Sequence, residues 1–401
     1  MMKMKKISIL EFYLKSFCLF ICLILSGCAM IRHPLPQNLI GQADVRDMPE
    51  IREVIGVDNP KISDSIIKAV LTDKPGDYTL DGQGNRVYPI LAISGGSANG
   101  AYGAGLLKGW SQAGTRPKFK AVTGISTGSI IAPFVFLGKE YDTVVEQIYT
   151  TMSTRNVLRM RRPLAALFGD SFASNQPLAH LLEKYLTQEI ITKIAQEHNQ
   201  GRRLFVGTTY LDAQRLVVWD MGAIACRKDY MLFRKVILAS AAMPIMFPPV
   251  YIRVQVDGRS YDEMHVDGGT VTQVFTLFSL MRGVEALAKA QGLDASKVKA
   301  DYYIIRNGYV SPAYKAVGGN LISIANRSLD TIINNQGVGD LYRIYVVMKE
   351  RGNEYNLAYI PGDFRPTQKE EFDSQEMQAL FERGYQDALQ GYKWHKSPPG
   401  L

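Results

Sequence analysis

Short apolar runs alternate with helix-length segments through the middle of the chain, and glycine-rich turns separate them. Residues 87–94 form one such run, and 104–113 follow it as a helix. The pattern then repeats, with a strand at 119–125 and a mostly apolar helix at 129–137. Alternation of buried strands with helices is typical of a sheet that is covered by helices on both faces. The sequence therefore predicts a three-layer α/β/α fold with a mainly parallel central sheet.

Further elements continue towards the C-terminus. Asp257-Gly258 separates two strand-like runs, which predicts a hairpin. Residues 28–86 are rich in proline, aspartate and glycine, with one helical stretch near 62–71, and we interpret them as a linker and collar. We place the main domain at 87–310 and a helical extension, packed on its core, at 311–401. The remaining expected elements are strands at 204–211, 216–221, 251–256, 261–266, 302–306 and 342–348, and helices at 230–242, 321–335 and 374–389.

Residues 1–27 have the pattern of a secretion signal. Three lysines lie among the first six residues, an apolar run covers 16–25, and small residues precede Cys28. The run is shorter than the roughly 20 residues that a membrane-spanning helix needs. The Leu25-Ser26-Gly27-Cys28 order resembles the lipobox of bacterial lipoproteins, which implies cleavage before Cys28 and acylation of that cysteine. The alternative is a plain signal peptide or signal anchor with an incidental cysteine.

The mature body would then be tethered to a membrane by lipid and not embedded in it. Ala29 follows the cysteine in place of aspartate, and resemblance to other lipoproteins then implies the outer membrane of a bacterial cell envelope. Of the four cysteines, Cys226 alone would remain free, so we expect no internal disulfide.

Charge bears on the class of partner. Loss of residues 1–27 removes four lysines and one glutamate, which lowers the net charge from +8 to +5. A mildly basic body suits an anionic membrane surface, although a scattered solvated excess is the simpler interpretation. No basic stripe with interleaved aromatic residues points to nucleic acid.

Gly124-Ile125-Ser126-Thr127-Gly128 joins the second strand to its helix. A serine nucleophile needs a sharp, exposed strand-to-helix turn, and small flanking residues such as Gly124 and Gly128 make that turn possible. The G-x-S-x-G motif alone is a weak signal, because a glycine-rich loop with a serine N-cap has the same letters. The strand before it and the helix after it favour a nucleophile elbow at Ser126.

A second glycine-rich loop, 94–105, lies between the first strand and its helix. Successive N–H groups in such a loop can converge on an anion. The loop lacks the lysine of a phosphate-binding P-loop, and no acidic residue follows where a dinucleotide site would need one. Beside a serine elbow, the favoured role is to bind the oxyanion of an acyl-transfer reaction.

A serine nucleophile also needs a base, which is usually histidine. Asp267 ends a strand and precedes Gly268-Gly269, so its carboxylate could face the serine from a neighbouring strand end. A simple turn is the alternative. His265 lies two residues earlier, on the same face of the strand. It could tune Asp267 or act as a surrogate base, although a mere neighbour is the simpler interpretation.

Four blocks, in this order, resemble the patatin-like phospholipase family: the glycine-rich loop, G-x-S-x-G, the segment Ala239-Ser240-Ala241-Ala242-Met243-Pro244 with Phe247-Pro248-Pro249-Val250, and D-G-G. The resemblance covers about 90–270, and 381–388 is similar in style to the closing helix of the family. It implies a patatin-like fold and a catalytic dyad in which Ser126 attacks and Asp267 takes its proton. The N–H groups of Gly95, Gly96 and Ser97 would bind the oxyanion, and Gly100, Gly124, Gly128, Gly268 and Gly269 would be the motif glycines.

One departure concerns the glycine-rich loop. The family pattern is usually G-G-G-x-[RK]-G, whereas Ser97 replaces the third glycine and Asn99 the basic residue. The backbone donors remain, but Ser97 must adopt a turn that glycine accepts more readily. Loss of the basic residue puts the rate or the headgroup preference in doubt.

The resemblance implies hydrolysis of ester-linked acyl chains from membrane phospholipids or lysophospholipids, with no metal and no organic cofactor. Alternatives are a small-acyl esterase, a thioesterase or a protein acyltransferase. From another class, the alternative is an idle envelope lipoprotein that binds lipid or scaffolds a complex. The sequence does not determine the oligomeric state.

Residues 155–168 carry several arginines before apolar residues and Pro163. Such a segment could rest on a bilayer. A surface helix that ends at Pro163 is the alternative, which we favour.

Overall fold

The computed structural model describes residues 32–401, apart from 47, 58–60, 75, 163–168, 277–288, 290–291, 293–296, 313, 315 and 366–369. The expected signal peptide at 1–27 and the expected lipidation site Cys28 therefore lie outside the described residues. In the part of the chain that is described, no helix is long and apolar enough to cross a membrane.

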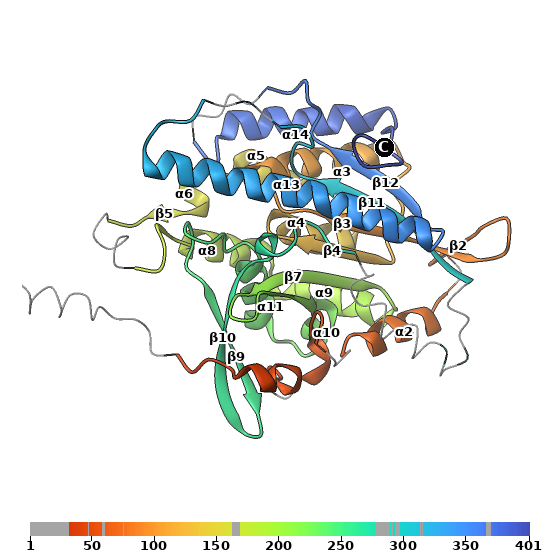
Figure 1. The fold of residues 1–401 in the computed structure, drawn as a ribbon. Helices are drawn as coiled ribbons and strands as arrows, with labels where there is room; N and C mark the ends of the chain where they lie inside the picture. The colour runs from red at the N-terminus through yellow and green to blue at the C-terminus, as the bar shows by residue number, and fades with distance from the viewer. Residues whose placement is uncertain are drawn as a thin grey trace, which may run out of the picture.

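Among the described residues, ten strands form one sheet through the centre of the fold (Figure 1). The neighbouring strands β7, β4, β3, β11 and β12 are parallel, and the antiparallel strands β8 and β1 extend the sheet beyond β7. The hairpin β9–β10 joins β7 through β10, and β2 pairs with β3. The bounds are β1 Arg52–Val54, β2 Thr79–Leu80, β3 Arg86–Ile93, β4 Ala121–Ile125, β7 Arg203–Tyr210, β8 Arg215–Asp220, β9 Val250–Val256, β10 Arg259–Asp267, β11 Val298–Arg306 and β12 Glu354–Tyr359.

Helices cover both faces of the sheet, because alternate residues of a buried strand point to opposite sides. In β3, Leu91 and Ile93 belong to the core on one face, whereas Ile90 and Ala92 belong to the core on the other. The first face carries α3, α4, α5, α8, α9, α10, α11 and α14, and the second carries α2 and α13. Their bounds are α2 Ser63–Leu71, α3 Gly100–Gln112, α4 Thr127–Leu137, α5 Asp142–Thr151, α8 Gln176–Tyr185, α9 Gln188–Asn199, α10 Met221–Cys226, α11 Tyr230–Ser240, α13 Leu321–Glu350 and α14 Ser374–Leu389. The predicted three-layer α/β/α architecture is confirmed.

The expected hairpin is present as β9–β10. Asp257 and Gly258 both have positive φ, 48° and 75°, as a two-residue type I′ turn requires. This turn sets the register of β10 and so places its last residue, Asp267.

One expected strand is wrong. Residues 342–348 lie inside α13, which continues to Glu350. The run is rich in β-branched and aromatic residues, which favoured a strand, but its buried residues Leu341, Ile344 and Met348 recur at helical spacing. The strand in this region is β12, which pairs in parallel with β11, so the segment 311–401 is not purely helical.

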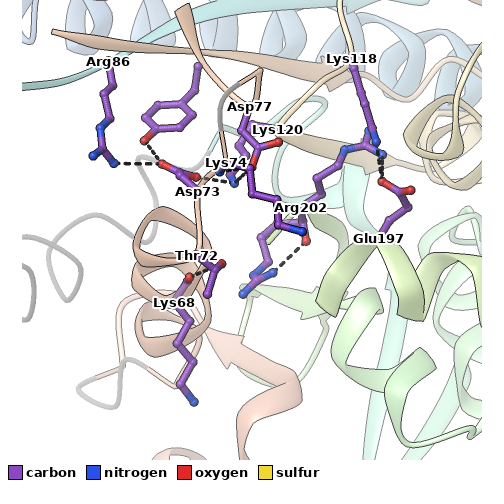
Figure 2. Close-up of polar contacts among 12 residues, drawn as sticks. Lys68, Thr72, Asp73, Lys74, Asp77, Arg86, Lys118, Lys120, Glu197 and Arg202 are labelled. Carbon is purple, nitrogen blue, oxygen red and sulfur yellow. Dashed lines mark hydrogen bonds and ion pairs between the residues drawn. The ribbon is translucent and has the colours of Figure 1, made fainter. Parts of the chain in front are cut away.

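The segment interpreted as a linker and collar contributes directly to the sheet and its core. β1 pairs with β8, and Ile66 and Ile67 of α2 are buried against the second face. Figure 2 shows Asp73, just after α2, between Arg86 and Lys120. Asp73 accepts from Lys120 Nζ at 2.6 Å and from Arg86 at 3.2 Å. These ion pairs attach the collar to β3 and to the residue before β4, at the amino ends of those strands.

Residues 155–162 do not form the expected surface helix. The one-turn helix α6 (Thr154–Val157) ends early, and β5 (Arg159–Met160) then pairs with β6 (Ala173–Ser174) as a separate two-stranded ribbon. Residues 163–168 lie outside the described residues.

Candidate active site

The long strand β7 brings two distant strand ends together. Along one edge of β7, the parallel strand β4 ends with Ile125 opposite Gly207. On the same edge, the antiparallel strand β10 ends with Asp267 opposite Thr208, the next residue of β7. The residues at these two ends, Ser126 and Asp267, therefore meet although 141 positions separate them in the sequence.

Ser126 occupies a sharp turn between β4 and α4. Its φ of 52° and ψ of −122° lie outside the regions that most residues prefer, as expected of a nucleophile elbow. Its N–H donates to Ser240 Oγ at 3.0 Å, and that hydroxyl donates to the carbonyl of Gly207 at 2.7 Å. Ser240 thus ties the strained turn to β7.

The glycines around the Ser126 turn have no room for a side chain. A Cβ on Gly124 would lie 2.5 Å from the carbonyl oxygen of Gly128, and one on Gly128 would lie 2.3 Å from that of Ile93. A Cβ on Gly100 would lie 2.3 Å from Thr127 Oγ1. Any side chain at these positions would move the elbow away from the neighbouring strand and helix.

The carboxylate of Asp267 is buried and faces Ser126. It accepts a hydrogen bond from the N–H of Gly269 at 2.7 Å, and the Ser126 side chain lies close enough to lower its pKa. Burial raises the pKa of Asp267 to about 6, against the opposing effects of Ser126 and of the Gly269 N–H. At neutral pH the group is mostly ionised, so it can accept a proton from a serine hydroxyl.

The glycines after Asp267 are also constrained by close contacts. A Cβ on Gly268 would lie 2.5 Å from the carbonyl oxygen of Gly207, and one on Gly269 would lie 2.6 Å from Gln273 Nε2. The turn after β10 therefore packs directly on β7 and on the Gln273 side chain.

The glycine-rich loop lies over the serine elbow. A Cβ on Gly95 would be 3.2 Å from Ser126 Cβ, and one on Gly96 would be 2.0 Å from the carbonyl oxygen of Asn307. Ser97 has a φ of 52°, which confirms the expected turn that glycine would accept more readily.

The three expected oxyanion donors are not equivalent. The N–H of Gly95 already donates to the carbonyl of Gln273, at 3.0 Å. In the described part of the chain, the N–H groups of Gly96 and Ser97 have no acceptor. These two groups, near the positive N-terminal end of α3, are the donors that remain for an anion.

Three further residues support this arrangement, and no motif in the sequence pointed to them: Gln273, Asp340 and Asn307. Gln273 donates its side-chain amide to the carbonyl of Gly269 at 2.7 Å, and its N–H donates to Asp340 of α13 at 2.6 Å. Asn307, after β11, donates to the hydroxyl and the carbonyl of Ser94. Ser240, in contrast, lies within the block quoted for the family resemblance, which was therefore a usable signal for it.

His265 does not face the serine through either ring nitrogen. Nδ1 bonds Thr208 Oγ1 at 2.9 Å and Nε2 bonds Glu263 at 3.1 Å, all fully buried. Burial lowers the pKa of His265, so it is neutral at physiological pH. Burial alone would raise the pKa of Glu263, but Arg52 and His265 outweigh that effect and bring it to about 2. His265 therefore belongs to a buried network with Glu263 and Arg52. Of the three interpretations, this contact pattern favours a residue that merely neighbours Asp267 over one that tunes it or acts as a base.

Among the described residues, no group of three or more histidine, cysteine, aspartate or glutamate side chains could hold a metal ion. Cys226 is free and exposed, and partial burial of its thiol raises its pKa.

Comparisons with known proteins match part of the chain to one family model. The family model described as patatin-like phospholipase matches residues 91–277, which include Ser126 and Asp267. Among solved structures, VipD from Legionella pneumophila is similar, with 13% identity, a TM-score of 0.37, and coverage of 78% of this chain and 69% of VipD. No curated protein matches the chain.

Proposed function

We propose that this chain, whose residues 91–277 match the patatin-like phospholipase family model, is a serine acyl hydrolase that cleaves acyl esters of membrane lipids with Ser126 and Asp267. The family match supports lipid acyl hydrolysis in the broad sense. The observation that carries the specific proposal is that Ser126 and the buried Asp267 carboxylate lie at adjacent strand ends on β7, close enough for Ser126 to lower the pKa of that carboxylate.

In the first half of the proposed reaction, Ser126 Oγ attacks the ester carbonyl carbon while Asp267 takes its proton. The bond between Oγ and the acyl carbon forms, and the electron pair of the carbonyl moves to its oxygen. Collapse of this tetrahedral species breaks the ester C–O bond. The leaving alcohol takes the proton from Asp267, which returns the carboxylate to its ionised form.

The oxyanion would be stabilised by the N–H groups of Gly96 and Ser97. Both lie in the loop over Ser126 and are held by the contact of Gly96 with Asn307. Donors that are already in place cost no reorganisation during the reaction, and one such donor typically contributes about 3 kcal/mol to transition-state stability.

In the second half, water attacks the acyl-serine and Asp267 accepts its proton. The carbon–Oγ bond breaks, the proton returns to Ser126, and the fatty acid leaves. The same carboxylate thus acts as base for both nucleophiles, and no histidine is needed.

A direct test measures fatty acid release from mixed phospholipid micelles. Ser126→Ala and Asp267→Asn should each lower the rate by at least about a thousandfold. Asp262→Asn is the matched control, because it removes a carboxylate from the same strand, β10, and should leave the rate unchanged. A wild-type protein that is inactive on phospholipids and on short acyl esters, and is not labelled by a fluorophosphonate, would favour the idle lipid-binding lipoprotein.

We also propose that the body is attached to the envelope through Cys28, with the outer membrane as its site. The support is the Leu25-Ser26-Gly27-Cys28 order after the apolar run. An anchor of this kind raises the local concentration of membrane substrate without any specific contact. Metabolic labelling with palmitate should mark the wild type and not Cys28→Ala, and equal labelling of both would contradict the proposal.

A further inference from the structure

Exposed apolar side chains gather on the N-terminal half of α13. Leu321, Ile324 and Ile332 are 82%, 50% and 62% exposed. Leu321, Leu329 and Ile332 share one face, because their spacing returns to the same side of a helix. An exposed apolar stripe on a helix is unusual for a surface that meets only water. We call Leu321, Ile324, Leu329 and Ile332 the helical patch.

The helical patch leads directly to the active site. Further along α13, Gln336 donates to the carbonyl of Val271, and Asp340 accepts from the N–H of Gln273. Both partners lie in the segment that follows Asp267. The half of α13 that carries the patch therefore extends outward from the helix turns that support the catalytic aspartate.

A second exposed apolar group adjoins Asp267 by another route. Met160 of β5, Phe172 beside β6, and Ile245 are 62%, 43% and 51% exposed. The N–H of Phe172 donates to the carbonyl of Ile245 at 2.8 Å. Three residues before Ile245, the carbonyl of Ala242 accepts the N–H of Asp267, also at 2.8 Å. We call this group the ribbon patch.

Basic residues accompany the ribbon patch. Arg155, Arg159 and Arg162 are exposed around it. A hollow of about 340 Å³ opens between α5, α6 and α8, with Met152 and Leu181 among its apolar lining residues. Its basic lining residues are Arg155, His180 and Lys184, and no acidic residue lines it. The acidic neighbours are Glu183, which contacts His180 at 3.4 Å, and Asp170, which pairs with Arg161 at 2.9 Å.

We propose that the helical patch and the ribbon patch together dock the protein on an anionic lipid bilayer, beside the active site to which both connect. In Figure 1 the start of α13 and the β5–β6 ribbon extend towards the same side of the molecule. The apolar side chains enter the interface between headgroups and acyl chains, and the arginines pair with lipid phosphates. The inference rests on the proposed lipid substrate and adds how the bilayer is engaged.

Charge favours a bilayer over a second copy of the chain. A two-fold contact through the ribbon patch would bring the arginines of one copy against those of the other. An anionic surface, by contrast, neutralises them, and each basic residue near such a surface strengthens its binding. The mildly basic body agrees in sign with this occupant.

The experiment measures vesicle binding without relying on hydrolysis. The full chain carrying Cys28→Ser, which removes the proposed acylation site, is sedimented with vesicles of phosphatidylglycerol and phosphatidylcholine or of phosphatidylcholine alone. The double variants Leu321→Ser/Ile332→Ser and Met160→Ser/Phe172→Ser should each weaken binding to both vesicle types by about tenfold. Arg159→Gln/Arg162→Gln should weaken binding to the anionic vesicles by about tenfold and have little effect on the neutral ones.

Leu80→Ser and Arg259→Gln are the matched controls. Leu80 is 66% exposed in β2, beside the start of β3, and Arg259 is exposed at the β9–β10 turn. Both should bind like the parent, and all variants should keep the parent rate on a soluble short-chain ester.

Unchanged binding by the patch variants would overturn the proposal and assign binding to the N-terminal segment. A shift from dimer to monomer in the helical-patch variant, with unchanged vesicle binding, would show that a second copy covers the patch. Neither result depends on whether phospholipid is hydrolysed, which the Ser126→Ala comparison decides separately.

Discussion

Replacement of Asp267 by asparagine should abolish hydrolysis and at the same time stabilise the folded protein at neutral pH. Burial raises the pKa of Asp267 from 3.8 to about 6, so ionisation of this group opposes folding. Each pKa unit corresponds to about 1.4 kcal/mol, and the difference of roughly two units amounts to about 3 kcal/mol. A carboxyl group whose pKa is raised by folding makes a contribution to stability that is fully present below its unfolded-state pKa. That contribution is lost as the pH rises through its folded-state pKa. Asparagine keeps the shape and the acceptor for Gly269 but carries no charge.

The assay is urea unfolding of the wild type and Asp267→Asn at several pH values. The advantage of the variant should grow from under about 1 kcal/mol at pH 4 to about 3 kcal/mol at pH 8, with no further rise above pH 8. All other titrating groups are shared, so they cancel in the difference. Asp262→Asn serves as the control for removal of a carboxylate from β10. A difference for Asp267→Asn that does not change with pH would refute the raised pKa, and full esterase activity of that variant would refute its role as base.

The remaining predictions concern the same site and its support. The kcat/KM of the wild type on a soluble ester should fall about tenfold per pH unit well below pH 6, as Asp267 becomes protonated, and a flat profile from pH 4 to 8 would exclude it as the base. Ser97→Gly removes a side chain at a φ of 52° and should raise the free energy of unfolding by up to about 1 kcal/mol, despite the loss of an exposed hydrogen bond to Glu371; a loss measured by urea unfolding would contradict the strain. Glu263→Gln leaves the buried Arg52 without its anion and should cost about 3–5 kcal/mol by thermal or urea unfolding, whereas esterase activity per folded molecule should change little. An equal effect from Glu354→Gln, whose ion pair is exposed, would show that burial does not set this cost.

Local patterns were sufficient to predict most of the fold and to single out Ser126 and Asp267 as candidates. Strands such as β3 and β4 combine β-prone apolar residues with glycine-rich ends, and these signals are contained within a few positions. The same holds for Ser126, because an elbow is made by its immediate neighbours. The strand expected at 342–348 failed because local composition favoured a strand while packing of Leu341, Ile344 and Met348 on the sheet favoured a helix.

The supporting residues could not be found in this way. Gln273, Asn307 and Asp340 act through hydrogen bonds to residues far away in the sequence, and an isolated glutamine or asparagine carries no motif. The role of His265 was likewise undecidable, since it depends on whether its ring nitrogens reach Ser126 or Glu263. Both nitrogens are occupied within the buried network, which only the packed sheet creates.

The sequence by itself determined which residues can turn sharply and carry chemistry, because glycine spacing, strand ends and the serine and aspartate types are local properties. Only the tertiary structure decided that Ser126 and Asp267 meet. Their contact depends on β7 being long enough to pair with β4 along one half of an edge and with β10 along the other. It also decided that the N–H of Gly95 donates to the carbonyl of Gln273, which leaves the N–H groups of Gly96 and Ser97 as donors for an oxyanion. Pairing of distant strands and burial of a carboxylate are properties of the assembled sheet, and no short stretch of sequence encodes them alone.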